Sequence, residues 1–353
     1  MVQIEQHVWG MTPEGEAIIL YTMRNDKGAE VKITNFGAAI VSVTMPDREG
    51  RMADVVLGYK HPEGYFFDGA ASGKSVGRCA NRIAFGRMTV EGKEYALEVN
   101  NGPNHLHGCF NRKLYRVKSF GDTLLMEAES PDGEDGFPGN LKIAVRYTLT
   151  EDNAFRMDYR VSSDADTIVN LTNHSYFNLD GGGDVLNQKL RIYASRYLEG
   201  NNATCPTGNI LPVANTPMDF TAGKTIGKEI DTGFAQTTMV GGGYDHCYVI
   251  DRARGSSQSI CAWATSDKTG ISMKLYTTQP GIQLYTANFL QDCPSPGKGG
   301  KPLQKYGGFA LETQHYPCSP SHPEFPSTVL RAGKVFRATT TLRFFTGKQC
   351  GKL

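Results

Sequence analysis

The sequence predicts an all-β protein, a large antiparallel β-sandwich with few short helices. Two observations support this class. Apolar and polar residues alternate with period two in several segments, and glycine or proline interrupts nearly every stretch long enough for three helical turns. We also find no internal repeat and no linker. We therefore expect one domain that spans residues 1–353.

The clearest alternation belongs to two segments on either side of the polar turn 151–153. Each segment has apolar side chains on one face and basic or polar side chains on the other. Two such runs about a short turn predict an antiparallel hairpin with one buried face. The positions expected to be buried are Ile143, Val145, Tyr147, Leu149, Phe155, Met157, Tyr159 and Val161.

Other segments extend the β prediction over most of the chain. The alternation returns at 336–344, and segments 17–23, 31–45, 271–278 and 281–286 are rich in β-forming residues. The stretch 293–302, with three prolines and three glycines, predicts a long surface loop. The predicted elements thus alternate strand with loop and leave little room for helices.

Charge and composition exclude several classes of partner. The chain has 37 Lys+Arg against 36 Asp+Glu, and no block of like charge that would attract nucleic acid or an anionic membrane. No stretch approaches the roughly 20 apolar residues that a membrane-spanning helix needs. The eight cysteines include no Cys-x-x-Cys pair, which excludes a zinc ribbon and favours free thiols in a reducing compartment. We expect a cytoplasmic protein.

The C-terminal tripeptide offers an alternative location. Gly351-Lys352-Leu353 differs by one residue from the Ser-Lys-Leu signal for peroxisomal import. An organelle of peroxisome type is therefore the second possibility for the compartment.

Polar residues gather in five segments that a sandwich would place on loops or strand ends. Each segment alone has an ordinary structural explanation. His105 and His107 could both be metal ligands on one strand face, or simply a hydrogen-bonded loop pair. His174 could satisfy buried backbone groups, Glu312 could be a strand-end carboxylate, and Arg82 could pair with a surface acid. The five segments are 77–83, 100–108, 170–179, 244–246 and 311–317.

Taken together and in order, these segments closely resemble the aldose 1-epimerase (galactose mutarotase) family. The resemblance extends from about Ile33 to about Phe344. Further matches lie at 136–139, 279–283 and 322–326. The motifs that carry it are Gly77-Arg78-Cys79-Ala80-Asn81-Arg82-Ile83, Asn104-His105-Leu106-His107-Gly108, Asn173-His174-Ser175-Tyr176-Phe177-Asn178-Leu179, Tyr244-Asp245-His246 and Leu311-Glu312-Thr313-Gln314.

The resemblance implies a β-sandwich with an open sugar groove and assigns roles to single residues. Glu312 corresponds to the catalytic base and His174 to the catalytic acid. The remaining matches are substrate-binding positions, and His105 is left as a structural neighbour. Those substrate-binding positions are Asn81, Arg82, His107, Tyr176, Asp245 and Gln283.

The implied reaction interconverts the α and β anomers of free hexoses such as galactose and glucose. Ring opening removes a proton from the C1 hydroxyl and delivers one to the ring oxygen, so a positioned base and acid suffice. We therefore expect no metal and no other cofactor. A carboxylate base and an imidazolium acid predict that the rate falls at both acid and alkaline pH.

Two positions depart from the family pattern. Cys79 stands where a small apolar residue is usual, and a buried thiol behaves as one. Cys318 replaces a common aspartate downstream of Glu312, where we expect it to alter a local turn and to touch no residue with an assigned role.

Three other functions remain open on the sequence. An epimerase for hexose 6-phosphates would need a basic cluster for the phosphate. A non-catalytic carbohydrate-binding protein would need neither Glu312 nor His174. A metalloenzyme using His105 and His107 is the weakest alternative. For the preferred function we expect a monomer that binds a small sugar, with no nucleic-acid or membrane partner.

Overall fold

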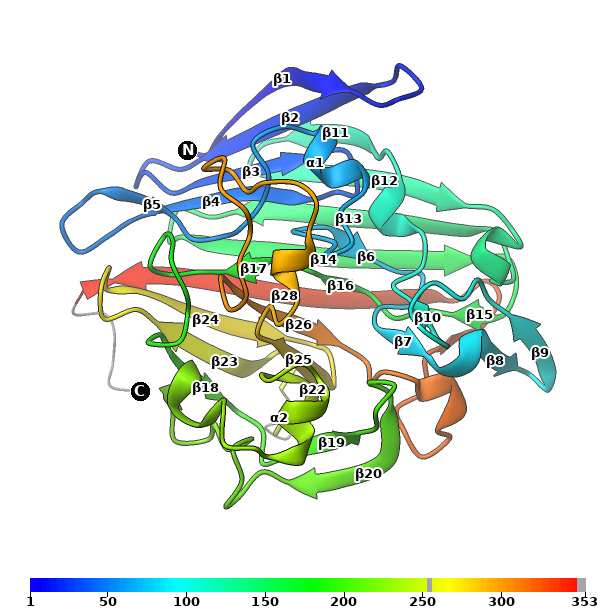
Figure 1. Ribbon diagram of the computed structural model, residues 1–353. Coiled ribbons are helices and arrows are strands. Elements are labelled where there is room, and N and C mark those ends of the chain that lie inside the picture. Colours follow the sequence, from blue (N-terminus) through cyan, green and yellow to red (C-terminus); the bar gives the residue numbers. More distant parts are fainter. Residues whose placement is uncertain (253–255, 348–353) are drawn as a thin grey trace.

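Nearly all regular structure in this protein is extended, as the sequence predicted (Figure 1). The computed structural model describes residues 1–252 and 256–347. The α-helices in these ranges are α1 (Glu63–Phe66) and α2 (Ala235–Met239), each about one turn long. The all-β class is therefore confirmed.

The largest layer is a nine-stranded antiparallel sheet. Its strand order is not sequential, because β28 inserts between β14 and β24 and so joins two groups of strands that are distant in sequence (Figure 1). In spatial order the strands are β11 (Arg116–Phe120), β12 (Thr123–Ser130), β13 (Leu141–Leu149), β14 (Ala154–Ser163), β28 (Val335–Thr346), β24 (Ile271–Thr277), β23 (Ser259–Thr265), β18 (Lys189–Ile192) and β21 (Lys224–Thr225).

Strands β13 and β14 form the predicted hairpin. Leu149 pairs with Phe155 across the turn, and Leu141 pairs with Ser163 at the far end. All eight apolar positions expected to be buried are buried, while the intervening side chains face outward. Period-two alternation therefore fixed both the strands and the face that each presents to the core.

Two further sheets provide most of the remaining strands. The six-stranded sheet consists of β17 (Tyr176–Phe177), β26 (Phe309–Gln314), β25 (Gly281–Tyr285), β22 (Asp245–Val249), β19 (Arg196–Gly200) and β20 (Pro206–Pro212). The five-stranded sheet consists of β1 (Gln3–Met11), β2 (Ala17–Arg24), β3 (Glu30–Thr34), β4 (Ile40–Pro46) and β5 (Met52–Asp54).

Four short ladders complete the fold, and two of them help to build the site described below. They are β7 (Arg82–Ile83) with β10 (His105–Leu106), β6 (Ser75–Val76) with β16 (Thr172–Asn173), β8 (Arg87–Val90) with β9 (Lys93–Ala96), and β15 (Thr167–Ile168) with β27 (Val329–Leu330).

One hydrophobic core connects the three large sheets. It contains Val31 from the five-stranded sheet, Val145 and Tyr159 from the nine-stranded sheet, and Leu284 and Phe309 from the six-stranded sheet. Burial of each such side chain stabilises the fold by about 1.5–3 kcal/mol. The result is a sandwich in which the nine-stranded sheet packs against the other two.

The loop prediction for 293–302 is confirmed, since no helix or named strand falls there. Among the described residues, no helix is long and apolar enough to cross a membrane. The tripeptide Gly351-Lys352-Leu353 lies outside the described residues.

Candidate active site

A cleft of about 470 Å³, with both polar and apolar lining residues, lies where the six-stranded sheet meets two of the short ladders. Seven of the eight residues expected at the site line this cleft, although they come from five separate segments of the chain. They are Asn81, Arg82, His107, His174, Tyr176, Asp245 and Glu312.

Glu312 lies in the middle of strand β26 and not on a loop or a strand end, as the sequence had suggested. Its side chain is almost completely buried. Gln283 of β25 is its direct neighbour across the ladder. A position inside a sheet holds the carboxyl group rigidly, because β25 pairs with β26 along Ala310–Gln314 and β17 pairs with the start of β26.

His174 lies immediately after β16, and its backbone is fixed by the segment that precedes β6. The His174 N–H donates to the carbonyl of Lys74, and the N–H of Gly73 donates to the carbonyl of His174, both at 2.9 Å. The imidazole points at the carboxyl group of β26, with Nε2 lying 3.6 Å from Oε1 of Glu312. Tyr176 stacks beside His174, with ring centroids 4.9 Å apart, and donates its hydroxyl to the carbonyl of Ala70 at 3.0 Å.

One polar atom on each of these two side chains has no hydrogen-bond partner in the described ranges. These atoms are Nδ1 of His174 and Oε2 of Glu312. A buried polar atom without a partner costs about 1–3 kcal/mol, so native proteins keep few of them. Both atoms are buried, and both belong to residues that line the cleft.

The ladder of β7 with β10 brings Arg82 next to His107, because Arg82 pairs with Leu106. Asn81 and His107 both have left-handed backbones, with φ of 64° and 72°. That conformation costs L-residues about 1–2 kcal/mol. His107 is followed by Gly108, where an added Cβ would lie 2.5 Å from the backbone nitrogen of Arg78, so only glycine fits. Strain and close packing here serve to aim the two side chains at the cleft.

A hydrogen bond fixes the proton of His107. The backbone N–H of Asn81 donates to Nδ1 of His107 at 3.3 Å. A neutral imidazole that accepts at Nδ1 carries its hydrogen on Nε2 and can donate from that atom. His107 also packs edge-on against His174, with ring centroids 5.2 Å apart.

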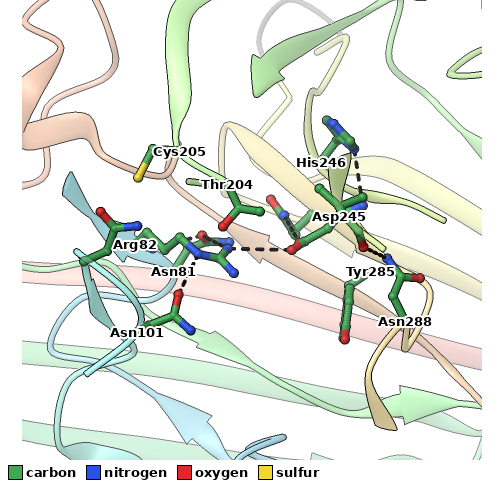
Figure 2. A network of polar contacts seen from close by, with 12 residues as sticks. Asn81, Arg82, Asn101, Thr204, Cys205, Asp245, His246, Tyr285 and Asn288 are labelled. Atoms are coloured by element: carbon green, nitrogen blue, oxygen red, sulfur yellow. Dashed lines mark hydrogen bonds and ion pairs between the residues drawn. The ribbon is translucent and has the colours of Figure 1, made fainter. Parts of the chain in front are cut away.

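A chain of polar contacts crosses the floor of the cleft (Figure 2). Nη1 of Arg82 lies 3.6 Å from Oδ2 of Asp245, and Nε of Arg82 donates to Oδ1 of Asn101 at 3.1 Å. Gln283 donates from Nε2 to Oδ1 of Asp245 at 2.6 Å. Gln283 does not line the cleft, which differs from its expected place beside the sugar. Its observed contact holds the Asp245 carboxylate in place.

Burial governs the ionisation of the facing pair. Desolvation raises the pKa of Glu312 to about 8, with a further rise from the charge of Asp245 and an opposing effect of Arg82. Desolvation lowers the pKa of His174 to about 4, although the carboxylates of Asp68 and Asp245 oppose it. Without a bound ligand, His174 and Glu312 therefore share one titratable proton between about pH 4 and about pH 8. The expected carboxylate and imidazolium are replaced by a carboxyl group and a neutral imidazole.

The same cause keeps His107 neutral. Burial lowers the pKa of His107 well below its usual value, and the neighbouring His174 and Arg82 lower it further. The neutral form agrees with the tautomer set by Asn81, so His107 is a stable hydrogen-bond donor over the physiological range.

A buried amide outside the cleft ties three of the contributing segments together. Asn170 donates from Nδ2 to the carbonyls of Ala80 and His315, both at 3.2 Å, and accepts from the N–H of His315 at 2.8 Å. Its own N–H donates to the carbonyl of Arg78 at 2.9 Å. Asn170 thus links the segment of Asn81 and Arg82, the segment of His174, and the end of strand β26.

Both cysteines that depart from the family pattern are buried. Cys79 packs in an apolar cluster with Ile83 and Phe137, as expected for a small apolar substitute. Cys318, in contrast to our expectation, does contact a site residue, since its backbone N–H donates to the carbonyl of Arg82 at 2.8 Å. Cys318 has a left-handed backbone, with φ of 55°. The turn that contains it helps to position Arg82.

His105 has a structural place, as expected. Its Nδ1 lies 2.7 Å from the carbonyl oxygen of Glu98, its ring packs edge-on against Phe137, and it does not line the cleft. Within residues 1–252 and 256–347, no group of three or more His, Cys, Asp or Glu side chains is arranged to hold a metal ion.

The cleft includes several residues that the sequence did not single out. Asn101 was part of a recognised polar segment and could have been chosen from its amide chemistry. Tyr285 ends strand β25, the others come from segments with no motif, and only the proline-rich composition after residue 293 marked one of these segments. The residues missed include Asn101, Thr204, Tyr285, Phe289, Asp292 and Cys293.

Comparison with known proteins agrees with this geometry. Residues 20–343 match the family model described as aldose 1-epimerase. Galactose mutarotase of Rattus norvegicus is 38% identical over 350 residues, which cover 98% of this chain and 99% of that protein. Aldose 1-epimerase of Escherichia coli (strain K12) is 37% identical over 341 residues, which cover 95% of this chain and 97% of that protein.

Solved structures give the same result. The galactose 1-epimerase of Lactobacillus acidophilus NCFM superposes with a TM-score of 0.86 at 25% identity, covering 98% of this chain and 100% of that one. An aldose epimerase homologue from C. elegans superposes with a TM-score of 0.85 at 28% identity, covering 98% of this chain and 99% of that one.

Proposed function

Because the chain belongs to the aldose 1-epimerase family, we propose that it interconverts the α and β anomers of free hexoses such as galactose and glucose. The observation that carries the proposal is the buried pair of His174 and Glu312, which face each other at 3.6 Å in the cleft. Each has an unpartnered polar atom for a ligand, and together they hold one exchangeable proton. The two side chains can therefore act as an acid and a base on two oxygens of one substrate.

Ring opening begins when the substrate binds and the shared proton moves from Glu312 to His174. Glu312, now a carboxylate, removes the proton from the C1 hydroxyl. His174, now an imidazolium, donates its proton to the ring oxygen as the bond from that oxygen to C1 breaks. The C1 oxygen becomes the carbonyl oxygen of the open-chain aldehyde.

Ring closure repeats the step in reverse on the other face. Rotation about the C1–C2 bond turns the aldehyde over, and His174 removes the proton from the hydroxyl that attacks C1. Glu312 returns its proton to the carbonyl oxygen. The proton then returns from His174 to Glu312, so no proton, electron or group is gained or lost overall and the two residues end as they began. These steps use only the two side chains and require no metal or other cofactor.

The other cleft residues hold the sugar during the rotation. Arg82 and Asp245 offer charge-assisted hydrogen bonds to hydroxyl groups, which are about twice as strong as neutral ones. His107 donates from Nε2, Asn81 adds an amide, and Tyr176 supports the ring of His174. Gln283 acts through Asp245, whose orientation it fixes.

The cleft favours a free hexose over a hexose 6-phosphate. Arg82 is the one lysine or arginine among the described cleft-lining residues, and it already contacts Asp245 and Asn101. A doubly charged phosphate would require further basic side chains. A carbohydrate-binding protein without catalysis would have no use for a buried acid–base pair, whose burial is costly.

We further propose that the protein is a single-domain monomer in the cytoplasm, with no nucleic-acid or membrane partner. The nearly balanced charge of the sequence supports the absence of a polyanionic partner. Light scattering coupled to size-exclusion chromatography would test the oligomeric state. A mass near 38.6 kDa is expected for a monomer.

The direct test is polarimetry of freshly dissolved α-D-galactose and α-D-glucose with wild type and Glu312→Gln. We expect wild type to accelerate mutarotation and the variant, checked for native structure by circular dichroism, to lose at least 100-fold. Failure of wild type to act on either sugar would refute the proposal. A fully active variant would leave the reaction intact but remove Glu312 from its role.

A further inference from the structure

The outer face of the nine-stranded sheet contains a hollow of about 320 Å³ that is separate from the active-site cleft. Four arginines line it, against a single aspartate. The side chains come from three adjacent strands, β13, β14 and β28, whose opposite face packs into the core. The charged residues of this arginine hollow are Arg146, Arg156, Arg160, Arg337 and Asp158.

The strand register forces these like charges together. Arg160 pairs directly with Arg337 across the ladder of β14 and β28. On the other side, Arg160 faces the small side chain of Ala144, and Arg146 follows two residues along β13. Like charges directly opposite each other on antiparallel strands destabilise a sheet. An unliganded hollow therefore carries a cost that an anion would relieve.

Three of the arginines have no local partner. Asp158 stands opposite Arg146 across the ladder of β13 and β14, but its Oδ1 accepts instead from Arg156 at 2.7 Å and from the hydroxyl of Thr339 at 2.6 Å. The side chains of Arg146, Arg160 and Arg337 have no hydrogen-bond, ion-pair or aromatic partner among the residues that the structure describes.

Basic residues elsewhere on the same face behave differently. Each of four neighbours is paired with an acid, and Lys274 of β24 and Arg191 of β18 lie over aromatic rings instead. The pairs are Arg116 with Glu129 at 3.4 Å, Lys118 with Glu127 at 3.0 Å, Lys142 with Glu129 at 3.7 Å and Arg343 with Asp152 at 3.0 Å.

We propose that the arginine hollow binds a small di- or triphosphate group. Guanidinium groups bind phosphate oxygens in bidentate fashion, which suits a planar cluster of arginines. Neighbouring strands are about 4.8 Å apart and two residues along a strand span about 7 Å. The three unpaired arginines are therefore spread over a distance greater than the width of a single phosphate group. The small volume and the flanking ion pairs favour a compact ligand over an extended acidic macromolecule.

This site lies on the outer face of the sheet, so it is not a subsite for the sugar. It does not depend on the function proposed above and would hold for a chain without that activity. The cleft residues play no part in it.

The test is isothermal titration calorimetry with inorganic tripolyphosphate, pyrophosphate and ATP at low ionic strength, where charge interactions are least screened. The protein is compared with the double variant Arg160→Gln/Arg337→Gln. The matched control is Arg116→Gln/Arg343→Gln, which loses the same charge from the same face but outside the hollow. Unchanged mutarotation or circular dichroism checks that both variants fold.

We expect saturable binding of one tripolyphosphate per chain to wild type and control, and at least tenfold weaker binding to the hollow variant. Equal affinity for ATP and tripolyphosphate would identify the phosphates as the recognised group, whereas tighter ATP binding would identify a nucleotide. Absence of saturable binding, equal weakening in the control, or tighter binding of a polyglutamate peptide would overturn the proposal.

Discussion

Nε2 of His174 lies 3.6 Å from Oε1 of Glu312, and burial drives both groups to their neutral forms. A neutral pair and a carboxylate–imidazolium pair contain the same number of protons. Transfer of the proton between the two side chains therefore leaves the net charge of the pair unchanged. The pair holds one proton between about pH 4 and about pH 8.

The first prediction is a bell-shaped pH profile of kcat/KM with limits near pH 4 and pH 8. Below the lower limit, His174 gains a second proton and the pair has no base. Above the upper limit, Glu312 loses the shared proton and the pair has no acid. Polarimetric rates in buffers from pH 3 to pH 10, corrected for buffer catalysis, would measure both limits, and a flat profile would contradict the assignment.

The second prediction separates the two charges that act on Glu312. The carboxylate of Asp245 raises the pKa of Glu312 and the guanidinium of Arg82 lowers it. Asp245→Asn should therefore move the alkaline limit of the rate to lower pH, and Arg82→Gln should move it to higher pH. Both variants should also raise KM, because each loses hydrogen bonds to the sugar.

The direction of these shifts is the discriminating result. If both variants moved the alkaline limit in the same direction, or left it in place, Glu312 would not be the group that titrates there. A conservative Arg82→Lys change keeps the charge and should leave the limit close to that of wild type while still raising KM.

The third prediction concerns stability. Glu312 titrates near 4.5 when exposed and near 8 in the fold, so the folded state loses stability as pH rises between these values. Each pKa unit corresponds to about 1.4 kcal/mol. Glu312→Gln removes this cost and should stabilise the protein by about 2–4 kcal/mol at pH 8.5, after allowing for the buried amide.

The same variant should show no gain at pH 4, because the carboxyl group is then mostly protonated in both states. Urea unfolding of wild type and Glu312→Gln at the two pH values would measure the difference. A gain that is independent of pH would show that the carboxyl group ionises normally in the fold.

The fourth prediction tests the link made by Asn170. Asn170→Ala leaves buried groups of Ala80 and His315 without partners and should destabilise the protein by about 2–4 kcal/mol. It should also lower kcat more than it changes KM, because Asn170 positions the reacting pair without touching substrate. Asn170→Asp retains the acceptor for the His315 N–H and should recover part of the stability. An Asn170→Ala enzyme with unchanged kcat would confine the residue to a structural role.

Much of the fold could be predicted from local sequence. The hairpin of β13 and β14 and its buried face were predicted correctly, because period-two alternation is determined by which side chains enter the core. The cleft residues could also be identified, because the motifs include seven side chains that the fold brings to one place. These successes depend on residues whose chemistry or spacing is visible in a short window.

Other features depend on packing that no short window contains. Glu312 was expected at a strand end but lies in the middle of β26, and Gln283 contacts Asp245 and does not line the cleft. The ionisation of His174 and Glu312 reverses because both side chains are buried, and burial favours the neutral form of each. The pairing of Arg160 opposite Arg337 requires the register of two strands that are far apart in sequence.

The position of β28 has a consequence for how the chain folds as it is synthesised. This strand, red in Figure 1, lies between β14 and β24, yet it is the last strand of the described chain to leave the ribosome. Until Thr346 has emerged, β14 and β24 each present an open edge of unpaired backbone groups, which can pair with another nascent chain. Closure of the sheet is thus a late event, and chaperones that shield these two edges should raise the yield of native protein.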